Sequence, residues 1–289
     1  MKIKRENLQV NNLTIKELLI LGYKYLHKDE TKLILATILN QNPLELSIHL
    51  DDKVEDELVL KYKKCLENIE KGLPIQYALG YVNFYSLNFI VDERVLIPRF
   101  ETEELVYNAN IYLNKYFKED VDILDLCTGS GCIGLTLKHL NKKRNITMSD
   151  ISKDALDVSR INANNLNLDV KLVESDLFTN LNNKFDCIIS NPPYVSLDDE
   201  VDEIVLNNEP KIALYANNNG LEYYEKILSQ CENYLNSKYL VAFEIGNTQK
   251  EEVIRLINKY LNNVKIITKQ DMSKKDRMVF IFKNIEIDE

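Results

Sequence analysis

The sequence predicts an α/β protein with a mostly parallel sheet covered by helices on both faces, preceded by a small all-helical unit. After residue 120, short apolar runs alternate with amphipathic helical segments, and a glycine-rich turn follows the first of these runs. Such alternation is typical of a Rossmann-like, mostly parallel sheet with helices on both faces. The first 80 residues contain no convincing strand pattern. We therefore expect two domains, which the length of 289 residues accommodates.

The predicted N-terminal domain, residues 1–80, consists of helices. Thr14 can cap the first helix with Glu17 at the capping-box position, and leucines follow at helical spacing. Further helices fit 31–40, a short segment opened by Pro43, and 54–71.

Residues 81–97 have the alternation of a β-hairpin, and we expect them to link the two domains. The second domain is predicted to span 98–289 and to open with a helix that runs to about 116. The predicted strands are 122–126, 145–149, 170–174, 185–190 and 239–245, with helices at 132–140, 153–164, 221–236 and 248–261. Two last strands, 264–268 and 278–282, are separated by a polar turn and should pair antiparallel at one edge.

The turn after the first strand carries Gly129, Gly131 and Gly134 in the spacing G-x-G-x-x-G. Glycines there allow a tight turn and a close approach of backbone to ligand. Asp150 ends the next strand, where a carboxylate can accept the hydroxyls of a ribose. The combination predicts a cofactor that contains a nucleoside.

A second motif, Asn191-Pro192-Pro193-Tyr194, follows the apolar run 185–190. Two prolines fix φ and donate no backbone hydrogen bond, so the chain should leave the sheet as a stiff, extended turn. Asn191 is then placed at the carboxyl end of a strand, where open α/β sheets bind ligands. An amide oxygen beside exposed carbonyls can accept the hydrogens of a planar NH2 group. In the alternative interpretation, the motif is a proline turn that only ends the strand.

The two motifs together favour S-adenosylmethionine over a dinucleotide, because methyl transfer to nitrogen uses two acceptors aimed at an NH2 group and hydride transfer does not. We assign the side-chain oxygen of Asn191 to one amide hydrogen and the carbonyl of Pro192 to the other. Tyr194 is expected to pack over the flat amide or, alternatively, in the core. Asp176 follows the third strand and could bind the adenine amino group, or be an ordinary exposed turn residue.

Several segments resemble the release factor glutamine methyltransferases, which methylate the glutamine of the Gly-Gly-Gln loop of peptide chain release factors. The resemblance covers nearly the whole chain and includes Leu96-Ile97-Pro98-Arg99 with Thr102-Glu103, residues 127–131, Asp150, residues 191–194 and Asp276-Arg277. It implies a class I S-adenosylmethionine-dependent methyltransferase fold, with an N-terminal domain that helps to hold the release factor.

The site residues that motif and resemblance together imply fall into three groups. Catalysis is assigned to Asn191, Pro192 and Tyr194, and substrate binding to Asn191, Pro192, Pro193 and Tyr194. Cofactor binding is assigned to Cys127, Thr128, Gly129, Ser130, Gly131, Asp150, Asp176, Leu177 and Asn191. The chain departs from the family at Phe100 and Glu101, where proline and aspartate are usual, at Cys127, where glycine is commoner, and at Leu177, where some members have an aromatic residue.

Composition limits the alternatives. The net charge is −9, which disfavours a main partner made of nucleic acid. Five cysteines without metal-ligand spacing favour a reduced, cytoplasmic compartment, and we expect no metal site, no membrane association and a monomer. The remaining alternatives are a methyltransferase acting on a ribosomal-protein glutamine, an N6-adenine DNA methyltransferase, and a non-enzymatic nucleotide-binding module.

Overall fold

The computed structural model describes residues 12–287, so the first eleven residues of the predicted N-terminal domain lie outside the described part. The chain divides into two compact units, Met1–Gly80 and Tyr81–Glu289. Among the described residues, no helix combines the length and the apolar character that crossing a bilayer requires.

The first unit is helical around one apolar core. Its elements are α1 (Ile15–Gly22), α2 (Lys28–Leu39), the 3-10 turn η1 (Glu45–Ser47), α3 (Asp56–Glu70) and α4 (Ile75–Leu79). The predicted capping box is present: the Thr14 hydroxyl accepts from the Glu17 backbone N–H, and the Glu17 carboxylate accepts from the Thr14 backbone N–H. Two predictions were wrong here. α2 begins three residues earlier than expected, and α4 was missed because Pro74, read as a helix stop, is instead the N-cap of a new helix.

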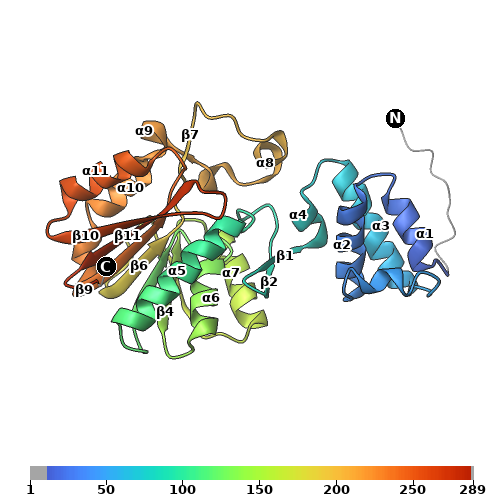
Figure 1. Ribbon diagram of the computed structural model, residues 1–289, viewed down its shortest axis with the longest axis horizontal. Helices are drawn as coiled ribbons and strands as arrows, with labels where there is room; N and C mark the ends of the chain where they lie inside the picture. The colour runs from blue at the N-terminus through green and yellow to red at the C-terminus, as the bar shows by residue number, and fades with distance from the viewer. Residues whose placement is uncertain (1–11, 288–289) are drawn as a thin grey trace. The chain divides into compact units, whose positions relative to one another are not determined.

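The second unit contains the predicted sheet (Figure 1). Seven strands lie in the order β10-β11-β9-β6-β3-β4-β5. Their bounds are β3 (Asp122–Leu126), β4 (Asn145–Asp150), β5 (Lys171–Glu174), β6 (Phe185–Ser190), β9 (Leu235–Glu244), β10 (Val264–Gln270) and β11 (Asp276–Lys283). The pairs among β9, β6, β3, β4 and β5 are parallel, whereas β11 is antiparallel to both β9 and β10. The expected antiparallel pairing at one edge is confirmed.

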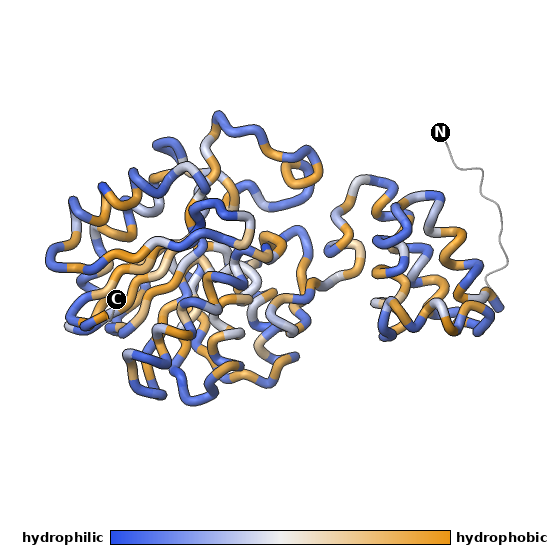
Figure 2. Tube along the Cα trace, viewed as in Figure 1, coloured by the Kyte–Doolittle hydropathy of each residue, from blue (hydrophilic) through white to orange (hydrophobic). Residues whose placement is uncertain are grey.

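Helices cover both faces of the sheet, as predicted. The helices on one face are α5 (Phe100–Tyr116), α6 (Cys132–Leu140) and α7 (Lys153–Asn165); those on the other are α10 (Glu222–Leu228) and α11 (Lys250–Tyr260). Alternate residues of each strand face opposite layers; Ile123 packs toward α5 and α6, whereas Leu124 packs toward α10 and α11. Figure 2 shows that the central strands consist mostly of hydrophobic residues, whereas hydrophobic and hydrophilic residues alternate along the flanking helices.

Some boundaries differ from the predictions. The hairpin consists only of β1 (Tyr81–Phe84) and β2 (Leu87–Ile90), and the rest of 81–97 is a loop. The helix expected over 221–236 ends at Leu228 and is followed by the 3-10 turn η3 (Cys231–Tyr234), and β9 begins four residues earlier than expected. Five short elements were not predicted: β7 (Val195–Ser196), α8 (Glu203–Asn208), η2 (Lys211–Ala213), β8 (Tyr215–Ala216) and α9 (Asn217–Gly220).

Candidate active site

A cavity lies at the carboxyl ends of β3, β4 and β6. β6 and β4 flank β3 on opposite sides, so the strand order reverses at β3, which is where open α/β sheets bind ligands. The glycine-rich turn follows β3, Asp150 ends β4, and Asn191 follows β6. The sheet therefore brings both motifs of the sequence to one cavity.

The turn after β3 presents backbone to this cavity. Gly129 has a φ of 55°, and a Cβ added there would meet no atom within 4 Å, so space is open beside it. Its N–H donates to the Asp150 carboxylate at 2.9 Å, and the Ser152 N–H donates to the other carboxylate oxygen at the same distance. Burial raises the pKa of Asp150, whereas these backbone hydrogen bonds lower it. Asp150 is thereby fixed in orientation while its oxygens keep further lone pairs for ligand hydroxyls.

Gly131 and Gly134 do not line the cavity; they allow close packing below the turn. A Cβ on Gly131 would lie 2.8 Å from Met148, and one on Gly134 would lie 2.9 Å from Asp125. Asp125 is fully buried in β3 and accepts from the Thr128 hydroxyl at 2.5 Å and from the Gly134 N–H at 2.9 Å. Gly131 was assigned to cofactor binding, but its position fits shaping the turn.

Cys127 and Leu177, the two residues near the cofactor motifs where the resemblance was expected to fail, share one conformation. Both line the cavity with positive φ, 62° and 46° respectively. This left-handed region favours glycine and costs other residues about 1–2 kcal/mol. The chain thus carries this conformational cost twice beside the cavity.

The turn after β6 is extended and firmly held. Asn191 and Pro193 line the cavity, whereas Pro192 is buried and does not. The carbonyl of Tyr194 accepts from the Gln249 side chain at 2.9 Å. The Val195 N–H donates to the carbonyl of Leu214, the residue before β8, and β7 and β8 form a short parallel pair. These contacts tie the turn to two further segments.

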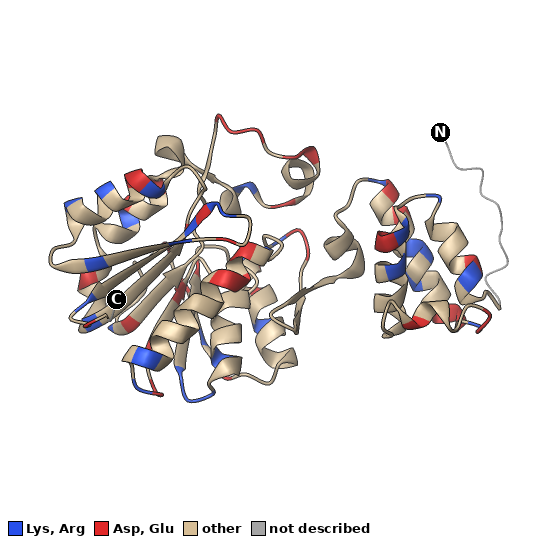
Figure 3. Ribbon diagram, in the orientation of Figure 1, with Lys and Arg blue, Asp and Glu red and all other residues tan. Residues whose placement is uncertain are grey.

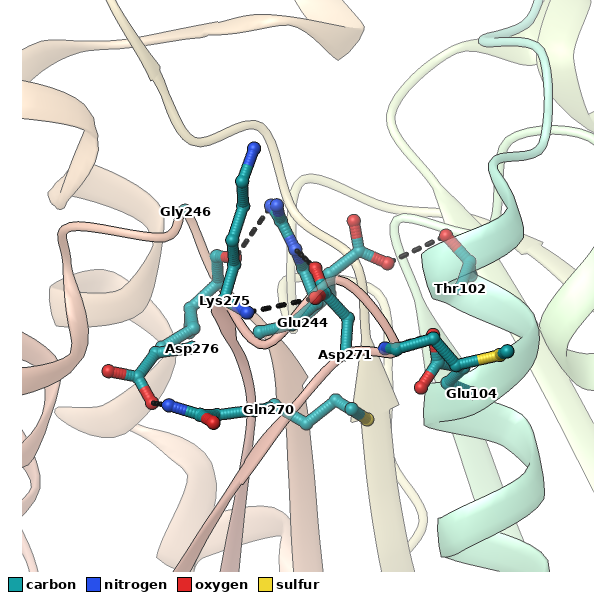
Figure 4. A network of polar contacts seen from close by, with 12 residues as sticks. Thr102, Glu104, Glu244, Gly246, Gln270, Asp271, Lys275 and Asp276 are labelled. Carbon is teal, nitrogen blue, oxygen red and sulfur yellow. Dashed lines mark hydrogen bonds and ion pairs between the residues drawn. The ribbon is translucent and has the colours of Figure 1, made fainter.

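The side chain of Tyr194 is directed into the protein and not into the cavity. Its hydroxyl donates to Glu244 at 3.2 Å, and burial raises its pKa. Its placement therefore differs from the expectation that it packs over a substrate amide and agrees with the core alternative. Glu244, at the end of β9, also accepts from the Thr102 hydroxyl at 2.6 Å (Figure 4). Asn191 donates to that hydroxyl at 3.3 Å.

Two ion pairs flank the cavity. Arg99 donates to Glu209 at 2.6 Å, and the Ile97 N–H donates to the other oxygen of this buried carboxylate. Arg94 and Asp92 form the second pair. Both arginines that line the cavity are thus already paired with carboxylates.

The segment from β7 into α8 carries several acidic residues (Figure 3). It precedes Pro210 and Ile212, which line the cavity.

Most predicted site residues meet at the cavity. It is lined by Cys127, Thr128, Gly129, Ser130, Asp150, Asp176, Leu177, Asn191 and Pro193, but not by Gly131, Pro192 or Tyr194. Sequence reasoning assigned no role at the site to Glu244, Arg94 or Tyr223. Glu244 had a detectable signal, since a carboxylate between Phe243 and Ile245 interrupts an apolar strand at its carboxyl end.

Comparisons with known proteins identify both units. Residues 26–80 match the PrmC N-terminal domain, and residues 100–207 match the methyltransferase small domain. A release factor glutamine methyltransferase of Streptococcus pneumoniae is 40% identical over 225 residues, which is 76% of this chain and 80% of that protein. One of Clostridium acetobutylicum is 34% identical over 284 residues, 92% of this chain and 98% of that protein.

Solved structures support the fold. A methyltransferase from Pyrococcus furiosus superposes with a TM-score of 0.52 at 18% identity, covering 70% of this chain and 91% of that one. Both relatives in sequence are more than a third identical to this chain over the aligned residues, and each alignment covers more than three quarters of both proteins. The chain belongs to the family of release factor glutamine methyltransferases.

Proposed function

We propose that this chain transfers a methyl group from S-adenosylmethionine to the side-chain nitrogen (N5) of the glutamine in the Gly-Gly-Gln motif of peptide chain release factors. The observation that carries the proposal is the position of the Asn191 carboxamide, which lines the same cavity as the glycine turn and Asp150. A cofactor site and an acceptor for amide hydrogens are therefore within one enclosure.

The residues present fit S-adenosylmethionine. The open space beside Gly129 admits a ligand against the backbone, and Asp150 offers fixed acceptor oxygens for ribose hydroxyls. Asp176 is exposed at the cavity wall and is assigned to the adenine amino group, and Leu177 to the face of the adenine ring. When bound, this cofactor supplies an electrophilic methyl group on a positively charged sulfur.

The role of the turn follows from the chemistry of an amide. Its nitrogen is a weak nucleophile because the lone pair is delocalised into the carbonyl, a resonance that gives the C–N bond a rotation barrier of about 18–20 kcal/mol. We assign the Asn191 side-chain oxygen to one N–H hydrogen and, although Pro192 itself does not line the cavity, its backbone carbonyl to the other. Together they hold the hydrogens in directions that suit a tetrahedral nitrogen. Fixing the geometry of attack can supply roughly 7–11 kcal/mol of the barrier. The alkylated nitrogen is acidic and releases its proton afterwards, so the chain needs no strong base.

Specificity for an amide follows from the same two acceptors. A glutamate in this position would direct an oxygen at both of them, and buried acceptors without a donor are costly. Sites built to hydrogen-bond a substrate group reject analogues that lack it by roughly 10⁴–10⁵-fold. The turn thus distinguishes the two side chains because both of its acceptors are paired when glutamine is bound and unpaired when glutamate is bound.

The N-terminal unit is proposed to bind the body of the release factor, because a loop glutamine offers little surface by itself. A variant that begins at Tyr81 should keep its affinity for S-adenosylmethionine and bind the release factor at least 10-fold more weakly. Titration calorimetry with each ligand tests this separation, and unchanged affinity for the release factor would contradict it.

The alternative of an adenine-specific DNA methyltransferase is disfavoured by charge. Nucleic acid binding relies on cations that contact phosphates, but Arg94 and Arg99 are already paired with Asp92 and Glu209. The overall charge of −9 points in the same direction.

Mass spectrometry of a release factor incubated with this protein and S-adenosylmethionine tests the proposal. We expect one added methyl group on the glutamine of the Gly-Gly-Gln motif. A ribosomal protein and double-stranded DNA, assayed in parallel, represent the alternatives. Methylation of either one without the release factor would refute the proposed substrate.

A further inference from the structure

The amide group of Asn191 can be useful in only one of its two orientations. Its oxygen accepts hydrogen bonds and its nitrogen donates them, and the two orientations differ by a rotation of the planar group. If the nitrogen faced the cavity, it would meet the donor hydrogens of a substrate amide. Something in the protein must therefore select the orientation with the oxygen toward the substrate.

The hydrogen bonds around Thr102 make this selection. A threonine hydroxyl has one hydrogen to donate, and here it is given to Glu244 over 2.6 Å. The hydroxyl oxygen can then only accept from its other neighbour. That neighbour is Asn191, 3.3 Å away, so its nitrogen must face Thr102 and its oxygen is left for the cavity.

Glu244 fixes the direction of these two successive hydrogen bonds, because an ionised carboxylate can accept hydrogen bonds but cannot donate them. Its side chain is buried, and its second oxygen accepts from the Tyr194 hydroxyl, so both hydroxyl groups are oriented toward it. Burial raises the pKa of Glu244, whereas the hydrogen bonds from Thr102 and Tyr194 and the positive charge of Arg277 in β11 lower it and so favour the ionised form. Figure 4 shows Glu244 at the end of its strand and Thr102 at the start of α5.

We propose that Thr102 and Glu244 are positioning residues that set the orientation of the Asn191 amide and so create the acceptor for the substrate N–H group. This inference rests on the proposed function, since it concerns the same turn. Thr102 and Glu244 would then act on the reaction through Asn191, without touching the reacting atoms. Thr102 belongs to a segment that the sequence singled out without explaining it, and Glu244 was not singled out.

The test compares two substitutions at one position. Thr102→Ser keeps the hydroxyl and should retain kcat within about 3-fold. Thr102→Val keeps the shape but leaves the Asn191 amide free to turn, so kcat should fall roughly 10- to 100-fold while the Kd for S-adenosylmethionine stays within about 2-fold. Thr136→Val is the matched control, because Thr136 is a buried threonine of α6 whose hydroxyl has no hydrogen-bond partner among the described residues. It should leave kcat unchanged.

A second arm separates orientation from simple packing. In Asn191→Asp, both side-chain oxygens are acceptors, so turning the group has no consequence. Adding Thr102→Val to this variant should therefore lower any remaining kcat by less than about 3-fold. An equal loss in both backgrounds, or unchanged kcat in Thr102→Val alone, would overturn the proposal.

Neutron diffraction from crystals of the deuterated protein tests the orientation without reference to activity. We expect the two amide deuterons of Asn191 on the side that faces Thr102, and the Thr102 deuteron toward Glu244. The opposite orientation would refute the proposal even in an active enzyme. Absence of any methyl transfer by the unsubstituted chain would instead contradict the proposed function, and the neutron map would still decide the orientation.

Discussion

The turns after β3 and β6 both line the cavity and both have a buried carboxylate beneath them, but they differ in how freely their backbone can move. In the proposed function, the turn after β3 uses the conformational freedom of Gly129 to bring backbone close to a ligand, whereas the turn after β6 uses Pro192 and Pro193 to hold acceptors still. Yet each is supported by a buried carboxylate that accepts from a threonine hydroxyl, Asp125 under the first and Glu244 under the second. A turn that binds a cofactor must let the backbone come close to the ligand, whereas a turn that holds a reacting amide must keep its acceptors in one direction.

If the second turn acts on the reaction and not on cofactor binding, removing its acceptor should affect turnover alone. Asn191→Ala is expected to lower kcat by about 10³-fold, because the nitrogen loses both orientation and electrostatic support. The Kd for S-adenosylmethionine should change by less than about 3-fold. Steady-state kinetics and titration calorimetry measure the two quantities, and equal losses in both would remove the distinction between the turns.

The first turn should show the reverse behaviour. Asp150→Asn is expected to weaken S-adenosylmethionine binding by about 10- to 100-fold, since the ribose hydroxyls lose a charged acceptor worth roughly 1.5–3 kcal/mol. At saturating cofactor, kcat should stay within about 5-fold of the unsubstituted chain. A large fall in kcat without a change in Kd would place Asp150 in the chemistry instead.

The buried carboxylate under the first turn predicts a dependence of stability on pH. Burial raises the pKa of Asp125 to about 7, while hydrogen bonds from Thr128 and Gly134 lower it. Since this is above the value of about 3.9 for an unfolded chain, the native state holds the proton more tightly, and the stability contributed by Asp125 is present below pH 4 and lost as pH rises through 7.

Denaturant unfolding between pH 4 and pH 8 measures this contribution. The unsubstituted chain should lose free energy of unfolding relative to Asp125→Asn by up to about 1.4 kcal/mol per pH unit within the interval from 4 to 7. A constant difference between the two proteins over that range would show that Asp125 does not hold a proton in the folded state.

The smallest expected effect concerns backbone strain in the first turn. Cys127→Gly removes a left-handed residue that costs about 1–2 kcal/mol, but glycine also increases the entropy of the unfolded chain by an amount worth about 0.4–1 kcal/mol. The net change in the free energy of unfolding should therefore be a gain between about zero and about 1.6 kcal/mol. A clear loss of stability would indicate that the Cys127 side chain contributes packing beyond its strain.

The elements that the sequence predicted well are those with local signals. β3, α6 and β6 have the expected bounds because an apolar run or a helical repeat is interrupted by glycine or proline. The helix at 221–236 was predicted too long, since its pattern continues through a 3-10 turn at Cys231. β7 and β8 have two residues each, which is too short for any repeat to be read.

The site residues could likewise be predicted only where a local sequence signal marks them. Residues on one strand end or one turn, such as Gly129, Asp150 and Asn191, follow from motif spacing. Contacts between distant segments do not, because Thr102 and Glu244 are 142 residues apart and only the completed sheet brings them together. The direction of the Tyr194 side chain likewise depends on β9, which no local pattern near Tyr194 describes.

The central claim is that two fixed acceptors select a carboxamide by its two hydrogens. The most direct measurement compares methyl transfer to a release factor with transfer to the same protein carrying glutamate in place of the glutamine of the Gly-Gly-Gln motif. The account predicts methylation of the first and a kcat/KM for the second lower by at least about 10³-fold. Comparable methylation of the glutamate side chain would contradict it.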